Sequence, residues 1–163
     1  MTNEEKARAL FMRGYNCAQS VFAAFAEQMK MDELQALRLA CGLGGGVGGR
    51  REMCGAVSGM IMAYGALRGY DTADDLELKA AHYASVRQLV EAFEDKFGTV
   101  SCRKLLGLDE GVKVLEPSAR TQEYYDARPC PEIVPAAAAM LERWLQEHPK
   151  RQEDTGKTNE SDQ

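Results

Sequence analysis

Five cysteines carry most of the chemistry that this sequence could perform: Cys17, Cys41, Cys54, Cys102 and Cys130. Their number is odd, so they cannot all be paired in disulfides within one chain. No CxxC pair occurs, which removes a thioredoxin-like motif, and no CxxCH occurs, which removes a c-type haem motif. His82 and His148 lie far from every cysteine in the sequence, so the usual spacing of a zinc finger is also missing. Joint chemistry of these thiols therefore depends on a fold that brings them together.

Two of the cysteines directly follow residues that commonly cap helices. Asn16 precedes Cys17, and Ser101 precedes Cys102. Asparagine and serine side chains accept hydrogen bonds from the first free N–H groups of a helix, so both cysteines are expected in a first helical turn. The unpaired N–H groups and the helix dipole at that position favour a thiolate. We therefore predict that both thiols are more acidic than an ordinary cysteine.

The other three cysteines have different surroundings. Cys54 opens an uncharged segment, residues 53–67, and we predict that its thiol is accessible and activated in the first turn of a helix. Cys130 is followed by Pro131, a residue that suits the first position of a helix, so it lies at or just before the last helix. Cys41 comes late in an amphipathic segment and is predicted to be an inert core residue.

A run of glycines, residues 42–49, leads into the uncharged segment. Residues 53–67 are too few to cross a membrane, which takes about 20 residues, and a helix that is apolar on all sides belongs inside a bundle. Gly55 and Gly59 are four residues apart, so they share one helix face. Glycine costs about 1 kcal/mol relative to alanine inside a helix, so tight packing is expected to compensate.

Hydrophobic periodicity elsewhere in the chain predicts more helices and no strand. The sequence therefore predicts an all-α fold, a compact bundle of five or six helices around a central apolar helix at about residues 53–67. Residues 1–147 form a single helical domain, and the polar residues 148–163 are predicted to be a disordered tail. Among the other helices, one is expected at residues 17–30 and the longest at residues 73–97.

Charge and composition limit the classes of function and the expected compartment. A net charge of −5 and an isoelectric point near 5.2 exclude a general nucleic-acid binder. The N-terminus is charged and lacks the apolar region of a signal peptide, so we expect a cytoplasmic protein that does not associate with membranes. Cysteines in that compartment are more often catalytic or metal-binding than disulfide-bonded. The leucine and glycine content is compatible with a homodimer.

Four stretches stand in a specific order: Asn16-Cys17-Ala18-Gln19, the glycine-rich loop with Cys54-Gly55-Ala56-Val57-Ser58-Gly59, Ser101-Cys102-Arg103-Lys104-Leu105-Leu106-Gly107, and Cys130-Pro131-Glu132-Ile133-Val134. Together they resemble the C_GCAxxG_C_C family of redox-active proteins, over residues from about 5 to 147. The resemblance assigns four motif cysteines: Cys17, Cys54, Cys102 and Cys130. Cys41 matches no family motif. Arg50 and Arg51 stand where a less charged run is expected, which would alter the ligand of the loop.

The first function that these residues support is redox chemistry. Clustered cysteine thiolates would carry out thiol–disulfide exchange or electron transfer, as an oxidoreductase would, with a redox partner or small-molecule substrate that the sequence does not identify. Cys54 is the predicted nucleophile, because the glycines would leave its sulfur accessible. Cys102 or Cys17 would resolve the intermediate by forming a disulfide with it.

Two other functions use the same residues. Cys17, Cys54, Cys102 and Cys130 could together hold zinc or an iron–sulfur cluster, if the bundle gathers four helix starts at one end. Alternatively, the loop could bind a small anion at a helix N-terminus, although the lysine of a P-loop motif is absent. The predicted anion ligands are Gly44, Gly45, Gly46 and Arg50. A flexible hinge with solvated arginines is the simpler interpretation of the same loop.

Overall fold

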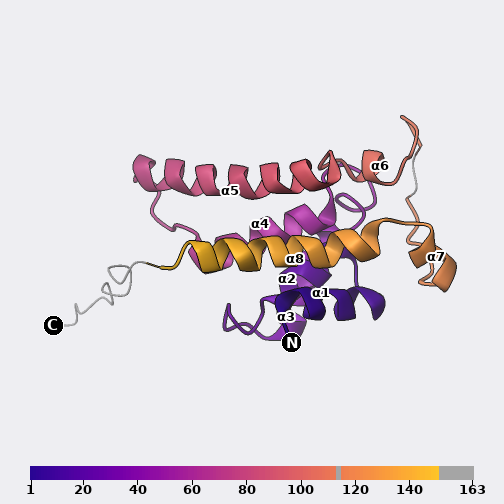
Figure 1. The fold of residues 1–163 in the computed structure, drawn as a ribbon, viewed down its shortest axis with the longest axis horizontal. Coiled ribbons are helices and arrows are strands. Elements are labelled where there is room, and N and C mark those ends of the chain that lie inside the picture. Colours follow the sequence, from indigo (N-terminus) through magenta and orange to yellow (C-terminus); the bar gives the residue numbers. More distant parts are fainter. Residues whose placement is uncertain (113–114, 151–163) are drawn as a thin grey trace.

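Helices account for nearly all regular structure in residues 1–112 and 115–150, which the computed structural model describes. Within these residues there are eight α-helices, one 3₁₀ turn and a single isolated bridge between extended residues (Figure 1). The prediction of an all-α fold is confirmed. The helices outnumber the predicted five or six because two of them, α6 and α7, are only about one turn long. The elements are α1 Asn3–Met12, α2 Cys17–Ala24, α3 Glu33–Ala40, η1 Cys41–Leu43, α4 Gly55–Arg68, α5 Leu76–Phe97, α6 Cys102–Leu105, α7 Gln122–Asp126 and α8 Cys130–Glu147.

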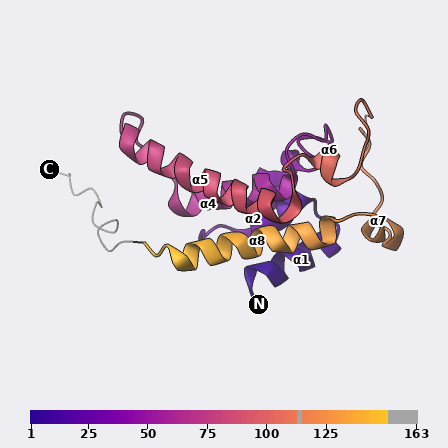
Figure 2. The same cartoon turned by 45° about the horizontal axis from the view of Figure 1, so that its top comes forward.

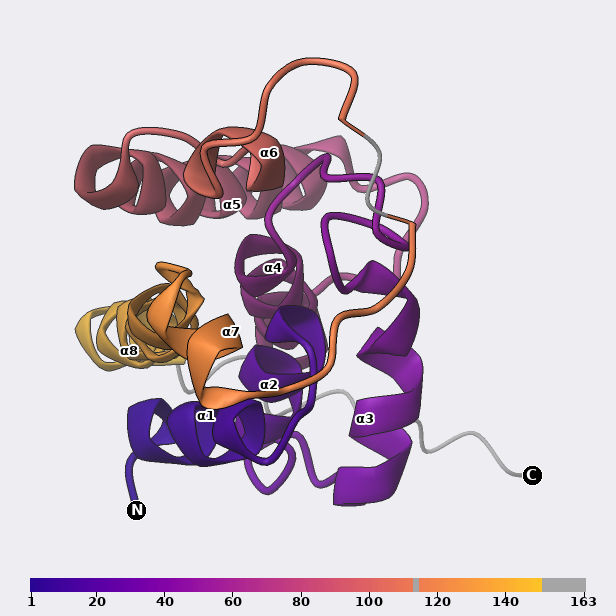
Figure 3. The ribbon, with the colours of Figure 1, turned by 90° about the vertical axis from the view of Figure 1, so that its right-hand side faces the viewer.

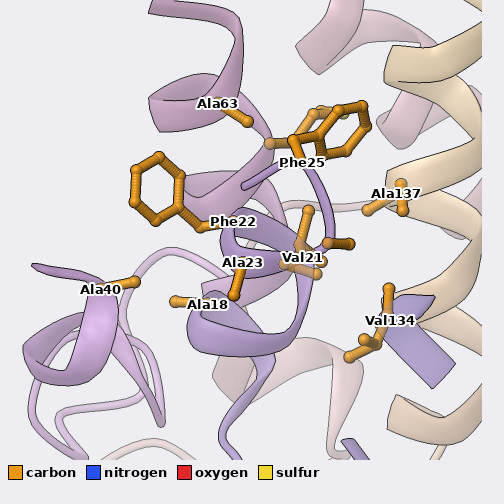
Figure 4. Packing of buried hydrophobic residues seen from close by; sticks show 14 of the residues in the cluster. Ala18, Val21, Phe22, Ala23, Phe25, Ala40, Ala63, Val134 and Ala137 are labelled. Atoms are coloured by element: carbon orange, nitrogen blue, oxygen red, sulfur yellow. The ribbon is translucent and has the colours of Figure 1, made fainter. Parts of the chain in front are cut away.

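The centre of the fold is shared by α2 and α4. In α2 both the apolar residues and Ser20 are buried, and this helix packs against α1, α3, α4 and α8. Figure 4 shows Val21, Phe22 and Phe25 of this region directed toward different neighbours, with Ala63 of α4 on one side and Val134 of α8 on another. The predicted central helix at residues 53–67 corresponds to α4, which begins two residues later. Its apolar surface is buried on most sides because α2, α5 and α8 all contact it.

Gly59 allows the close approach of α2 and α4. A Cβ atom at this position would lie 2.6 Å from the carbonyl oxygen of Ala18 and 3.1 Å from the Cβ atom of Val21. This carbonyl belongs to the first turn of the buried helix α2 and cannot move aside without disturbing that turn. The glycine therefore sets the distance between the two central helices, as the four-residue spacing of Gly55 and Gly59 predicts.

We expect Gly59→Ala to lower the free energy of unfolding by about 1–3 kcal/mol, because the added methyl group overpacks the α2–α4 contact. Gly65 in the same helix is the matched control. Nothing lies within 4 Å of a Cβ atom built there, so Gly65→Ala should be neutral or stabilise the helix by up to about 1 kcal/mol. Urea unfolding of both variants measures the difference. Equal stability of the two variants would contradict this packing of α4.

Two of the predicted helices have different bounds in the structure. The helix predicted at residues 17–30 ends at Ala24, and the chain then turns until Lys30, which has a positive φ of 54°. The helix predicted at 73–97 begins at Leu76, because the side chain of Asp75 caps it by accepting a hydrogen bond from the N–H of Leu78. Its end is as predicted, since Gly98 takes the left-handed conformation that terminates many helices.

The short helices α6 and α7 lie at the same end of the molecule. In Figure 1, α6, α7 and the first turn of α8 lie at one end, whereas the far ends of α5 and α8 lie at the other. The predicted disordered tail, residues 148–163, falls mostly outside the described residues, which stop at Lys150. No helix within residues 1–112 and 115–150 is both long and apolar enough to cross a membrane. The short helices thus mark the end of the fold where the cysteines are found.

Candidate functional site

The cysteines meet around one cavity of about 320 Å³ at this end of the fold. The glycine-rich loop and the starts of α2, α4, α6 and α8 form its walls, with the segment around residues 115–120 closing another side. Figure 3 looks toward this end and shows α6, α7 and the start of α8 nearest the viewer. The cavity-lining cysteines are Cys17, Cys41, Cys54, Cys102 and Cys130, and all five are unpaired thiols. The structure therefore brings together the four thiols that the sequence singles out, and adds a fifth.

The glycine-rich loop is held in place by its own backbone. Residues 45–49 all have positive φ values, and N–H groups of residues 47–49, 51 and 52 donate to carbonyl groups of residues 42–46. Val47, a β-branched residue, has a φ of 66°, a conformation that such residues rarely adopt. The loop is thus a fixed wall of the cavity, and the interpretation of it as a flexible hinge is not supported.

A short antiparallel pairing joins the loop to the start of α6. The N–H of Cys54 donates to the carbonyl of Val100, and the N–H of Cys102 donates to the carbonyl of Glu52, each at 2.7 Å. Met53 and Ser101 form the isolated bridge between these two bonds. This pairing places the starts of α4 and α6 side by side, with their cysteines on the same cavity; Figure 2 shows the purple loop next to α6.

The acidities of Cys17 and Cys130 depend on each other. Hydrogen bonding from the Cys17 thiol is the main cause that lowers the pKa of Cys130 to about 7. The guanidinium groups of Arg128 and Arg120 lower it further, against the opposing effect of burial. The pKa of Cys17 is correspondingly well above its ordinary value, because its proton is used in this bond and because burial disfavours its thiolate. Since the cations lie near Cys130, that residue carries the thiolate of the pair.

Cys54 differs most from its prediction. It is the residue before α4 instead of lying in its first turn, and only 5% of its surface is exposed. Burial raises the pKa of Cys54 to about 12, and the N–H groups of Ala56 and Val57 offset this only in part. The prediction of an accessible, activated Cys54 thiol is therefore wrong in this structure, because the ordered loop and the pairing with Val100 cover it.

Cys17 and Cys102 both lie in a first helical turn, as predicted, but the prediction that their thiols are more acidic than an ordinary cysteine is wrong. The prediction of a buried Cys41 is wrong as well. Burial raises the pKa of Cys102 despite the nearby guanidinium of Arg51, whose Nη1 donates to its sulfur at 3.9 Å. Cys41 is exposed at the start of the 3₁₀ turn, where the helix predicted to bury it has already ended. An exposed thiol should react before a buried one, so alkylation at pH 7 is now expected to be faster at Cys41 than at Cys54.

The two arginines of the loop have opposite environments. Arg50 is exposed, pairs with Glu52 at 3.5 Å and does not line the cavity, although it was the predicted anion ligand. Arg51 does line the cavity, together with the predicted ligands Gly44, Gly45 and Gly46. Arg51 has a positive φ of 62°, so the chain changes direction between the two residues and their side chains have different surroundings.

Two further arginines reach the cavity from a part of the sequence with no clear periodicity. The guanidinium carbon atoms of Arg120 and Arg128 lie 4.4 and 4.1 Å from the centre of the Tyr124 ring. Stacking on an aromatic ring holds a guanidinium in one orientation. Sequence reasoning missed both residues, since neither stands in a motif and only the fold brings them to the start of α8.

The comparison with known families agrees with these motifs. The model of the family described as "Putative redox-active protein (C_GCAxxG_C_C)" matches residues 15–144. The chain belongs to this C_GCAxxG_C_C family. The matched region contains all five cysteines and every arginine that lines the cavity. None of the curated proteins and none of the solved structures compared with the chain matches it.

The description of the C_GCAxxG_C_C family names redox activity but no metal. Among residues 1–112 and 115–150, no three side chains of histidine, cysteine, aspartate or glutamate are arranged so that they could hold one metal ion. A zinc or iron–sulfur site built from Cys17, Cys54, Cys102 and Cys130 would need these thiols to move closer together. That site remains a prediction, which elemental analysis can test.

Proposed function

We propose that this protein is a thiol–disulfide oxidoreductase that uses Cys17 and Cys130 as its redox-active pair. The observation that supports this proposal most directly is that both thiols line one cavity that a substrate can enter, where Cys17 is the main cause that lowers the pKa of Cys130. A disulfide between them requires their sulfur atoms to approach to about 2.05 Å. The membership in a family described as redox-active supports the same class of chemistry.

The reaction divides between the two cysteines according to their acidity. The Cys130 thiolate attacks one sulfur of a substrate disulfide, forms a mixed disulfide with it and expels the other half as a thiolate. Cys17 then loses its proton and attacks the Cys130 sulfur, which forms the Cys17–Cys130 disulfide and expels the second half of the substrate. Two electrons pass from the protein to the substrate, and the two released thiolates take up the two protons that the cysteines lose.

Cys54 and Cys102 have a supporting place in this proposal. Both thiols line the same cavity. Cys54 is buried and Cys102 is partly buried, and burial raises the pKa of each, at Cys102 against the opposing effect of Arg51 and Arg128. We propose that they form a second dithiol that can exchange with the first pair. The backbone pairing around the Met53–Ser101 bridge places them diagonally across that bridge, and both line the same cavity.

Equilibrium titration tests the proposed function. In a Cys41→Ser background, which removes the exposed thiol, the reduced protein is equilibrated with graded mixtures of a dithiol and its disulfide. We expect two thiols per chain to disappear in one two-electron transition. In that transition, the ratio of oxidised to reduced protein should change tenfold for every ~30 mV of the potential set by the dithiol mixture. Elemental analysis of anaerobically purified protein is the companion measurement. Stoichiometric iron or zinc, with thiols that react only after chelation, would contradict the proposal and favour a metal site.

A further inference from the structure

Three arginines line the cavity around the thiols, in a chain whose net charge is −5. Arg51 comes from the loop, Arg120 from the segment before α7 and Arg128 from the segment before α8. Within the described part of the chain, the ion pairs between side chains involve other residues and none of these three. Glu116, the carboxylate that lines the same cavity, is exposed and pairs with none of them. The cavity therefore concentrates positive charge that the described residues do not neutralise.

Two of these arginines have buried donor atoms without a partner. The Nε atom of Arg51 and the Nη1 atom of Arg120 are covered from solvent, and neither makes a hydrogen bond. A buried charged donor without an acceptor is unfavourable, so such atoms usually mark a missing partner. Both side chains are held in place on their other sides. Arg51 donates through Nη1 to Cys102, and Arg120 stacks on Tyr124.

The missing partner has to be an anion that fits among the thiols. Guanidinium groups bind carboxylate and phosphate groups through paired N–H donors, which makes arginine the usual residue for recognising them. A volume of about 320 Å³ is at the lower end of the range for small-molecule pockets, about 300–1,000 Å³. A small molecule can therefore reach the recessed thiols, whereas a folded protein domain cannot enter.

We infer that the cavity selects a small disulfide that carries carboxylate groups, with Arg51 and Arg120 binding the carboxylates while the disulfide lies against Cys17 and Cys130. This inference rests on the proposed function and names its substrate class. A carboxylate at each arginine would pair with its guanidinium group, and a shift of the side chain would bring the covered Nε and Nη1 donors to it. The substrate disulfide is the oxidant in the exchange described above: it accepts two electrons and two protons and leaves as two carboxylate-bearing thiols.

The test compares disulfides that differ in charge. Reduced protein reacts with 3,3′-dithiodipropionate, which is anionic, with bis(2-hydroxyethyl) disulfide, which is neutral, and with cystamine, which is cationic. Each rate is divided by the rate of the same probe with a small free thiol, which removes differences in intrinsic reactivity. We expect the anionic probe to react about tenfold faster than the neutral one, equivalent to about 1.4 kcal/mol. Equal normalised rates for all three probes would overturn the inference while leaving the proposed redox pair intact.

Neighbouring arginines supply a matched control. Arg51→Gln and Arg120→Gln should each reduce the preference for the anionic probe several-fold, because each removes a donor from the cavity. Arg50→Gln removes the same charge from the adjacent, exposed position and should leave the preference unchanged. If Arg50→Gln reduced the preference as much as Arg51→Gln, the effect would come from overall charge and not from a binding site.

A binding measurement separates this inference from the redox proposal. In a Cys17→Ser/Cys130→Ser variant, calorimetric titration with octanedioate measures recognition alone, because this dicarboxylate has the chain length of 3,3′-dithiodipropionate but no disulfide that the remaining thiols could attack. We expect saturable binding that Arg51→Gln weakens several-fold in this background and Arg50→Gln does not. Absence of binding would overturn the inference. A different outcome is that this variant binds the probe but no disulfide oxidises the thiols of the wild-type protein. That outcome would overturn the redox proposal, whereas the proposed anion site would stand.

Discussion

Replacing Gly46 with alanine is expected to lower the free energy of unfolding by about 2–5 kcal/mol and to disrupt the thiol cavity. Gly46 has a φ of 65°, which an alanine adopts at a cost of about 1–2 kcal/mol. Its added Cβ atom would also lie 2.6 Å from the backbone nitrogen of Glu52 and 2.8 Å from the Cβ atom of Cys102. Relieving that overlap costs about 1–3 kcal/mol more and moves the loop away from α6. Urea unfolding measures the loss.

Gly48 provides the control for this experiment. It has a φ of 57°, so alanine meets the same backbone strain there, but nothing lies within 4 Å of its Cβ atom. Gly48→Ala should therefore lower the free energy of unfolding by only about 1–2 kcal/mol. The alkylation rate of Cys102 should rise in the Gly46 variant and stay constant in the Gly48 variant. Equal losses in both would show that strain alone matters and that the loop does not pack on Cys102.

The second large effect is expected at Cys130 when Cys17 is replaced. Cys17→Ala removes the thiol that donates to Cys130, the main cause of its lowered pKa. The pH midpoint of Cys130 alkylation should therefore rise from about 7 by one unit or more, toward the value near 8.5 of a free cysteine. Below that midpoint the thiol is protonated and unreactive, so the variant should lose reactivity between pH 7 and 8. Site-resolved alkylation by mass spectrometry across pH 5–10 measures both midpoints.

Cys17→Ser separates the hydrogen bond from the disulfide. A serine hydroxyl still donates to the Cys130 thiolate, so the midpoint should remain closer to 7 than in Cys17→Ala, whereas neither variant can form the disulfide. A serine variant with the same midpoint as the alanine variant would mean that Arg128 and Arg120, and not the hydrogen bond, set the acidity of Cys130. An unchanged midpoint in both variants would rule out contact between the two thiols.

Local signals explain what the sequence could predict about this fold. Asn16 and Ser101 accept hydrogen bonds from the helix N–H groups three residues later, as their types suggest. Gly59 could be assigned to a tight helix contact because a glycine inside an apolar helix needs a reason. These predictions depend on residues within one or two turns of each other, and the helix starts that carry the cysteines follow from them.

The environment of each thiol could not be predicted, because residues far apart in sequence create it. Cys54 is buried since it pairs with Val100, and nothing in residues 43–59 points to that partner. The low pKa of Cys130 depends on Cys17, more than a hundred residues earlier. Whether Arg50 or Arg51 lines the cavity depends on the left-handed conformation of Arg51, which its residue type does not predict. Short-range patterns fix where helices begin, whereas acidity depends on tertiary neighbours.

The bond formed on oxidation tests the central claim most directly. Reduced protein is oxidised with a slight excess of 3,3′-dithiodipropionate, quenched in acid, alkylated and digested without reduction, and its cross-linked peptides are identified by mass spectrometry. We expect a peptide pair joining Cys17 to Cys130 to appear first and to be absent from both the Cys17→Ser and the Cys130→Ser variant. A first bond between Cys54 and Cys102, or an oxidised protein in which Cys17 and Cys130 both remain free thiols, would contradict it.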